Sequence, residues 1–302
     1  MTRRTLIQLA TGAGATLGLG WNPLAAQSGQ IIKKAIPATG EKIPAIGIGT
    51  NRYIVGTPEK NAGLMATLKA FIGLGGKLID TAPVYRTSET ILGQLIAELD
   101  IRDDLFIATK VEKKDRESAV ERMEESIVKL QTPVIDLMQS HQMNGAEKTL
   151  PVMREWREDA RLRYVGITTS DTATHPRMVE LMNKEPMDFI QVNYSLSNRE
   201  AAERILPLAA DKGIAVLINI PFARGTLFKA VADQPLPDWA AEFDCTSWAQ
   251  FFLKYVISNP AVTCAIPGAT KPHHATDNVG AAYGKLPDEK LRRKQEEYFD
   301  AL

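Results

Sequence analysis

The sequence predicts an α/β fold, a (β/α)8 TIM barrel, from three observations. Eight short apolar runs rich in β-branched residues recur between residues 45 and 268, and most are followed by a stretch with helical spacing. Such alternation indicates parallel strands joined by helices. No GxGxxG follows any run, which argues against an open dinucleotide-binding sheet. The 302 residues also suffice for one barrel of roughly 250 residues.

The first 28 residues are expected to be a targeting segment. They contain the pair Arg3–Arg4, a Gly- and Ala-rich run, and small residues at Ala25 and Ala26. A basic start, an apolar middle and a small-residue cleavage site define a secretory signal, and the paired arginines resemble the twin-arginine type. We therefore expect a periplasmic protein with no stable membrane insertion after cleavage, or a cytoplasmic one if the signal does not function.

A disordered basic tail or a membrane anchor is the alternative for this segment. Its apolar run is short and glycine-rich for a spanning helix, which needs about 20 apolar residues. These residues are therefore not expected to be part of the barrel.

Residues 30–302 are predicted to form one barrel domain. It begins with a β-hairpin, because two β-rich runs flank the turn signal ATGE at residues 38–41. The barrel strands follow as AIGIG, KLID, LFIATK, IDLMQ, RYVGIT, FIQVN, AVLINI and AVTCAIPG. Helical spacing is clear in ESAVERMEESIVKL and in EAAERILPLAADKG, which closes on the helix-end signal Lys212-Gly213. The segment KLPDEKLRRKQEEYF predicts an extra C-terminal amphipathic helix.

The charge balance and the cysteines exclude several classes of partner. Lys plus Arg and Asp plus Glu number 36 each. With no excess of positive charge, the chain is not expected to bind nucleic acid or an anionic membrane. Cys245 and Cys264 match no metal-ligand spacing, so no metal site is predicted. Cys264 is expected to be a small core residue, and a disulfide between the two stays open because export is expected.

Four polar residues occur where a barrel places its active site, at the C-terminal ends of the strands. Asp80, Lys110 and His141 end or follow the second, third and fourth runs, and Tyr85 lies in the loop after the second. Taken singly, the aspartate can be a turn or cap residue, the lysine a solvated strand end and the histidine a structural residue. Taken together, the four residues predict a catalytic group.

The predicted chemistry of this group is proton donation. A tyrosine has an ordinary pKa near 10, but a neighbouring ammonium stabilises a phenolate, and a carboxylate can hold that ammonium in place. We expect Asp80 to hold Lys110 while Tyr85 gives a proton to a carbonyl oxygen that gains negative charge. His141 is expected to orient the carbonyl through a hydrogen bond.

These motifs resemble those of the aldo-keto reductase family over nearly all of residues 30–302. LIDTAPVYRTSETILG is similar to its signature of DTA, a tyrosine, SE and LG. IATK and DLMQSH resemble its lysine and histidine strands, and RYVGITTSD and FIQVNYSL its GVSN-type turn and its glutamine strand. NIPFARGTLF resembles its SPLARG-type loop, and AIPGATKPHHATDNVGA its cofactor clamp.

The resemblance implies a TIM barrel that binds NADPH, or less often NADH, and transfers hydride between the nicotinamide and a small aldehyde or ketone. It makes Asp80, Tyr85, Lys110 and His141 the catalytic tetrad of a monomeric enzyme. The other residues are implied in cofactor binding: Thr168, Thr169 and Gln191 at the carboxamide; Phe222, Ala223, Arg224 and Gly225 at the pyrophosphate; and Gly268, Thr270, Lys271, His274, Asp277 and Asn278 at the adenosine end. Thr50 and Asn219, at the ends of their own runs, are further candidates.

Several departures from the family pattern bear on function. Asn219 stands where an aromatic residue usually stacks on the nicotinamide, and Thr168-Thr169 replaces SN, which loses an amide. His274 lies near the place of an arginine that grips the 2′-phosphate in part of the family, so NADPH preference rests mainly on Lys271. Arg86 replaces the usual glycine after the tyrosine. The short tail predicts an open substrate pocket.

A nucleotide-binding sensor or scaffold with little turnover is the alternative function. The resemblance extends to potassium-channel β subunits, which use this fold to bind nucleotide and a partner. The complete tetrad favours the enzyme, whereas Asn219 favours weaker positioning for hydride transfer. Turnover without any partner would separate the two.

Overall fold

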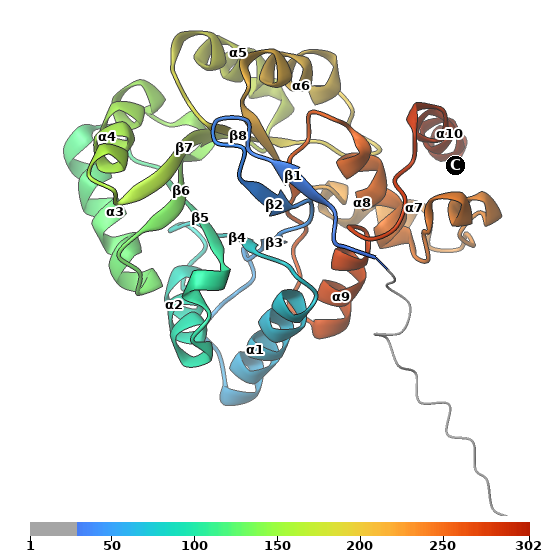
Figure 1. Cartoon of the computed structure of the whole chain (residues 1–302), viewed down its shortest axis with the longest axis horizontal. Coiled ribbons are helices and arrows are strands. Elements are labelled where there is room, and N and C mark those ends of the chain that lie inside the picture. Colours follow the sequence, from blue (N-terminus) through green and yellow to red (C-terminus); the bar gives the residue numbers. More distant parts are fainter. Residues whose placement is uncertain (1–28) are drawn as a thin grey trace, which may run out of the picture.

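The computed structural model describes residues 29–302; the predicted targeting segment lies outside the described residues, so its function stays a prediction. Eight parallel strands form a ring, each paired with the next along the chain. Parallel bridges from Ile46 to Ala265 and from Gly49 to Gly268 join its two ends, so the predicted barrel is confirmed (Figure 1). The strands are β3 (Ile48–Gly49), β4 (Leu78–Asp80), β5 (Phe106–Val111), β6 (Ile135–Ser140), β7 (Leu162–Thr168), β8 (Phe189–Asn193), β9 (Ala215–Asn219) and β10 (Cys264–Ala265).

The first and last strands of the ring are shorter than the sequence predicts. The runs at residues 45–49 and 261–268 keep only two regular residues each, because isolated bridges rather than a continuous ladder join them to each other. A Cβ added at Gly47 would lie 2.8 Å from the carbonyl oxygen of Leu78, and one at Gly49 would lie 3.0 Å from that of Ile266. Glycine is therefore favoured at both positions, where the β3 run lies close to β4 and to the last strand of the ring.

Helices cover the outside of the ring in the described residues (Figure 1). They are α1 (Pro58–Gly73), α2 (Ser88–Leu99), α3 (Arg116–Leu130), α4 (Ala146–Glu158), α5 (His175–Lys184), α6 (Ala201–Lys212), α7 (Thr226–Ala230), α8 (Trp248–Ser258), α9 (Pro272–Gly280) and α10 (Glu289–Asp300). Side-chain caps begin α1 at Thr57, α3 at Asp115, α8 at Ser247 and α10 at Asp288. As predicted, α6 ends at Gly213, whose φ is +65°.

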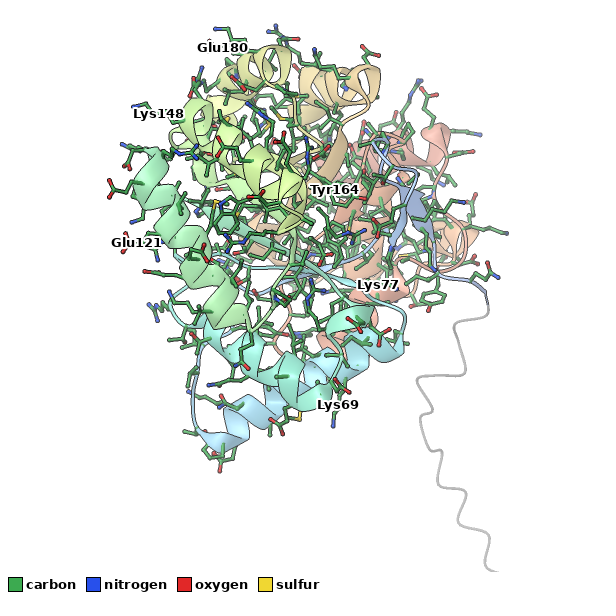
Figure 2. The ribbon with its side chains drawn as sticks, turned by 60° about the vertical axis from the view of Figure 1, so that its left-hand side comes forward. Lys69, Lys77, Glu121, Lys148, Tyr164 and Glu180 are labelled. Carbon is green, nitrogen blue, oxygen red and sulfur yellow. The ribbon has the colours of Figure 1, made fainter. Side chains whose placement is uncertain are left out.

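Most charged side chains of the helices face outward, whereas Glu89 of α2 and Lys254 of α8 are buried. Figure 2 shows Lys69, Glu121, Lys148 and Glu180 at the outer edge of the molecule, whereas Tyr164 is 4% exposed. No helix within residues 29–302 has the length and apolar character needed to cross a membrane. Cys245 and Cys264 are both buried and free, so the disulfide left open above does not form in the structure.

The predicted hairpin, β1 (Lys33–Ala35) and β2 (Lys42–Pro44), closes the N-terminal end of the ring (Figure 1). Ile36 and Ile43 are 0% and 1% exposed and pack into the inner cluster of the barrel beside Leu78 and Phe106. Full burial of each isoleucine contributes about 1.5–3 kcal/mol. The hairpin therefore plugs this end and leaves the opposite end for the site.

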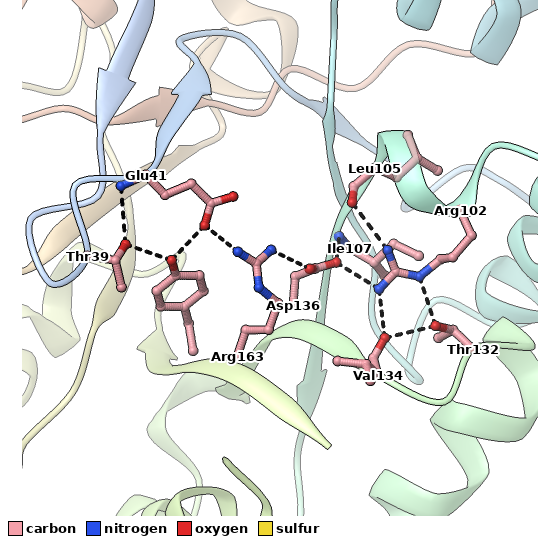
Figure 3. A network of polar contacts seen from close by, with 10 residues as sticks. Thr39, Glu41, Arg102, Leu105, Ile107, Thr132, Val134, Asp136 and Arg163 are labelled. Atoms are coloured by element: carbon pink, nitrogen blue, oxygen red, sulfur yellow. Dashed lines mark hydrogen bonds and ion pairs between the residues drawn. The ribbon is translucent and has the colours of Figure 1, made fainter. Parts of the chain in front are cut away.

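A polar network ties the hairpin to the strands (Figure 3). Glu41 pairs with Arg163 and accepts a hydrogen bond of 2.7 Å from the Tyr164 hydroxyl. Asp136, which is 3% exposed, accepts from Arg163 at 2.7 Å and from Arg102 at 2.9 Å. Its buried charge is thus compensated twice, as a buried carboxylate requires.

Candidate active site

A buried ion pair lies at the open end of the barrel, here called the mouth. The ammonium of Lys110 lies 2.8 and 2.7 Å from the two carboxylate oxygens of Asp80, and it also donates to the carbonyl oxygen of Thr81 at 2.7 Å. Lys110 and Asp80 are 2% and 3% exposed. All three ammonium protons thus have acceptors, and the predicted contact between Asp80 and Lys110 is present.

Strand register explains why these two residues meet. β4 ends at Asp80, which pairs with Ala108 of β5. Lys110 is two residues further along β5, so its side chain leaves the sheet on the same face as that of Ala108. Two adjacent parallel strands therefore bring the carboxylate and the ammonium together.

Tyr85 and His141 complete the group at the mouth. The Lys110 nitrogen lies 5.2 Å from the centre of the Tyr85 ring. The rings of Tyr85 and His141 are 6.2 Å apart and meet edge-on at 88°. The backbone N–H of Tyr85 donates to the carbonyl oxygen of Ala82, and its carbonyl oxygen accepts from the N–H of Ser88. Two consecutive tight turns thus position the phenol.

The charge states follow from burial and from neighbouring groups. Burial alone lowers the pKa of Lys110, but Asp80 and Tyr85 outweigh it and hold that pKa above its ordinary value. Burial, and then the charge of Lys110, lowers the pKa of His141 from 6.5 to about 4. Near pH 7 the site therefore holds a lysine cation and a neutral imidazole, which carries one N–H donor.

A buried hydroxyl cluster supports the end of β4. The Thr50 hydroxyl donates to the carbonyl oxygen of Asp80 at 2.9 Å, and the Ser88 hydroxyl lies 3.0 Å from Thr50 and 2.9 Å from that of Thr81. Thr50 was expected to contact a cofactor, but it is 0% exposed. The structure instead places Thr50 beneath the site, as a support for Asp80.

Two further polar residues, Gln139 and Glu89, contribute hydrogen bonds near the ion pair and were not predicted from the sequence. The side-chain amide of Gln139 lies 3.5 Å from Asp80, and Glu89 accepts a hydrogen bond of 2.7 Å from the hydroxyl of Thr109. Burial raises the pKa of the Glu89 carboxyl. Gln139 is two residues before His141 on β6, so the two-residue period of a strand could have placed it in the site.

Besides that of Gln139, two further buried amide oxygens near the mouth lack partners among the described residues. They belong to Gln191, which is 1% exposed, and to Asn219, whose nitrogen donates to the carbonyl oxygen of Thr169 at 2.8 Å. A buried acceptor left unpaired costs about 1–3 kcal/mol. A ligand amide could satisfy such oxygens. Thr168 and Thr169 are buried beside them, and the Thr169 hydroxyl is already bonded to that of Thr174 at 2.6 Å.

The loop after β9 holds a strained backbone. Ile220, Ala223, Arg224 and Gly225 have φ values of +50°, +46°, +56° and +91°. The left-handed region is unfavourable for residues other than glycine, and such strain concentrates at ligand sites. The loop borders a cleft of about 530 Å³, whose lining residues are Ser170, Asp171, Thr172, Asn193, Tyr194, Ser195, Asn198, Ile220, Ala223 and Arg224.

The residues predicted for the adenosine end divide into two groups. Gly268, Lys271 and His274 are exposed, and Lys271 directly precedes α9. Asp277 instead accepts hydrogen bonds from Ser247 and Gln250 of the α8 region, and Asn278 is 6% exposed. Gly268, Lys271 and His274 are therefore accessible to a ligand. The hydrogen bonds of Asp277 instead join α9 to α8.

Within residues 29–302, no cluster of three or more His, Cys, Asp or Glu side chains is arranged to hold a metal ion. A phenol above a charged ammonium can donate a proton, and a neutral imidazole can donate a hydrogen bond to the same acceptor.

Comparison with known proteins points to one family. A model described as the aldo/keto reductase family matches residues 45–297. Aldo-keto reductase YhdN of Bacillus subtilis (strain 168) is 33% identical over 212 residues, which cover 64% of this chain but only 62% of the relative. Methylglyoxal reductase YeaE of Escherichia coli (strain K12) is 27% identical over 274 residues, 88% of this chain and 95% of that one.

A solved structure agrees in fold. The aldo/keto reductase of Klebsiella pneumoniae in complex with NADP and acetate superposes with a TM-score of 0.73 at 25% identity, covering 86% of this chain and 93% of that one.

Proposed function

Because this chain belongs to the aldo/keto reductase family, we propose that it reduces aldehydes or ketones to alcohols with NADPH, and that Tyr85 is the proton donor. The observation that carries the proposal is the buried pair of Lys110 and Asp80 beneath the Tyr85 ring. A phenol next to a fixed ammonium is suited to protonate a carbonyl oxygen that gains charge. The printed names of relatives as an aldo-keto reductase and a methylglyoxal reductase support this reaction class.

The described residues fit a nicotinamide cofactor. The unpaired oxygens of Gln191 and Asn219 match the amide protons of a carboxamide. Arg224 and Lys271 are exposed, and each presents a positive charge for a phosphate. The complex of the Klebsiella pneumoniae relative with NADP supports this assignment. When bound, the reduced nicotinamide supplies a hydride to the carbonyl carbon.

Side chains of the protein supply the proton to the carbonyl oxygen and stabilise the negative charge that remains on Tyr85. Tyr85 donates its phenolic proton to the carbonyl oxygen, and the Lys110 ammonium stabilises the phenolate that remains. His141 is neutral and holds the carbonyl oxygen with one N–H, which fixes its direction. Asp80 keeps Lys110 in place and balances its charge. A proton from solvent then restores the phenol.

The competing function is a nucleotide-binding scaffold with little turnover, and one assay separates the two. Protein starting near Gln27 is mixed with NADPH or NADH and a panel of aromatic and aliphatic aldehydes, and the nicotinamide absorbance is followed. We expect oxidation that depends on the aldehyde, needs no partner and is faster with NADPH. Tight NADPH binding without turnover of any aldehyde would favour the scaffold.

The route of export is a separate proposal. Arg3–Arg4 and the small residues near Ala25 support a twin-arginine signal and a periplasmic destination. Replacing both arginines with lysine should leave the full-length chain in the cytoplasm on cell fractionation. Full-length wild-type protein found only in the cytoplasm would contradict export.

A further inference from the structure

We propose that the substrate carries a carboxylate as well as the reacting carbonyl, and that Arg86 binds this carboxylate. The inference rests on the proposed reduction at Tyr85 and concerns which carbonyl compounds the site prefers. Three features of Arg86 support it: its backbone conformation, its lack of a partner among residues 29–302, and the neighbouring loop.

The backbone at Arg86 has a conformation that favours glycine. Its φ is +56°, in a turn where the N–H of Ser88 donates to the carbonyl oxygen of Tyr85. A residue with a Cβ costs about 1–2 kcal/mol more than glycine in this region. A long charged side chain is therefore present, directly after the proposed proton donor, at a position where glycine would be more stable.

The guanidinium of Arg86 has no partner among residues 29–302. The side chain is exposed and forms no hydrogen bond or ion pair there, whereas Arg102, Arg163 and Arg199 on other parts of the barrel are all paired. The carboxylates near Arg86 in the sequence have other partners, since Asp80 is buried with Lys110 and Glu89 is buried against Thr109. The residue directly after Tyr85 in the chain thus carries an exposed positive charge with no partner among the described residues.

The loop after β3 adds a second cation and an apolar surface beside Arg86. The N–H of Val55 donates to the Thr87 hydroxyl at 2.9 Å, which joins the two loops. Arg52 on the first loop is exposed and also lacks an ion pair among the described residues. Ile54, Val55 and Val84 are 37%, 41% and 49% exposed. Such a rim fits an acid with an apolar body, because arginine binds carboxylates through two parallel hydrogen bonds.

The cations proposed for the cofactor come from another part of the barrel. Arg224 follows β9, and Lys271 follows β10. Arg86 instead lies between β4 and α2, in the loop that carries Tyr85. We therefore assign Arg86 to the substrate rather than to the phosphates of the cofactor.

The test compares 4-carboxybenzaldehyde with its methyl ester, which has the same ring and aldehyde but no charge. Specificity is the ratio of kcat/KM for the acid to that for the ester, measured with NADPH in wild type, Arg86→Gln and Arg204→Gln. Arg204 is an exposed arginine of α6 and serves as the control. We expect a ratio above one in wild type and in Arg204→Gln, and a fall of about tenfold or more in Arg86→Gln, mainly through KM of the acid.

A ratio that Arg86→Gln leaves unchanged would overturn the inference, as would a rise confined to KM for NADPH, which would assign Arg86 to the cofactor. Calorimetric titration with benzoate gives a readout that does not need turnover. Benzoate should bind wild type and Arg204→Gln more tightly than Arg86→Gln, and equal affinities would also overturn the inference. If neither aldehyde is reduced by wild type, the proposed function fails, and the titration still decides whether Arg86 binds a carboxylate.

Discussion

The Lys110 ammonium lies 2.7 Å from a carboxylate oxygen of Asp80, and both residues are almost fully buried. A buried charge is tolerated only when it is paired, so each residue of this pair requires the other. The pair lies beneath the Tyr85 ring and beside His141. It therefore both stabilises the mouth of the barrel and holds a fixed positive charge under the proposed acid.

Replacing Lys110 with Met should lower both stability and activity. Removing one partner leaves Asp80 uncompensated, which costs about 3–5 kcal/mol of the free energy of unfolding. Loss of the acid's partner should lower kcat by about 10²–10⁴-fold. Urea unfolding and steady-state kinetics measure the two effects.

The matched control is the double variant Asp80→Asn/Lys110→Met. It removes both charges, so we expect it to recover part of the lost stability without recovering kcat. A double variant that is as unstable as the sum of the two single variants would contradict the coupling of the pair.

Stability should fall as the pH falls from about 6.5 to about 4, in part through His141. The folded protein holds this imidazole neutral because of burial and Lys110, whereas the unfolded chain protonates it at the ordinary pKa of 6.5. The unfolded state therefore binds more protons in this window, and acidification favours it. Urea unfolding near pH 7 and near pH 5 should show a smaller acid-induced loss in His141→Asn than in wild type. Equal losses would show that His141 does not carry this dependence.

Replacing Arg86 with Gly should stabilise the fold. Glycine adopts φ of +56° without steric cost, so we expect a gain of about 0.5–1 kcal/mol in the free energy of unfolding. Arg86→Ala is the control, because it removes the guanidinium but keeps the Cβ and should show no such gain. A stabilisation of equal size in both variants would mean that the charge of Arg86, not its backbone, is unfavourable.

Shortening a buried side chain of the hairpin, β1 and β2, should destabilise the whole barrel. Ile43 is 1% exposed in the inner cluster, so Ile43→Ala should cost about 2–5 kcal/mol of the free energy of unfolding. Val128 is 74% exposed on α3, and Val128→Ala should change stability by less than about 0.5 kcal/mol. If the two substitutions cost the same, the hairpin does not seal the barrel as described.

Much of the architecture could be predicted because it depends on local patterns. The alternation of strand and helix, the hairpin around ATGE and the end of α6 at Gly213 all follow from periodicity and turn chemistry. The contact between Asp80 and Lys110 was predictable as well, because polar residues at the ends of neighbouring parallel strands must meet.

The predictions that differ from the structure depend on tertiary neighbours. The strands at residues 45–49 and 261–268 are short because only isolated bridges join these two runs where the ring closes. Thr50 supports Asp80 from below, and Asp277 is used by Ser247 and Gln250. A sequence motif predicts that such residues lie near a site, but it does not predict which neighbour forms a hydrogen bond with a given hydroxyl or carboxylate. That depends on which helix packs against which strand.

The most direct test of Tyr85 as the proton donor is the reduction of an aldehyde by Tyr85→Phe, which removes one oxygen atom and its proton. NADPH oxidation is compared in wild type, Tyr85→Phe and Tyr298→Phe, a matched substitution on α10, and the NADPH Kd is measured by fluorescence titration. We expect kcat to fall by about 100-fold or more in Tyr85→Phe alone, with NADPH still bound. A Tyr85→Phe variant with folded structure, bound NADPH and a kcat near that of wild type would contradict it.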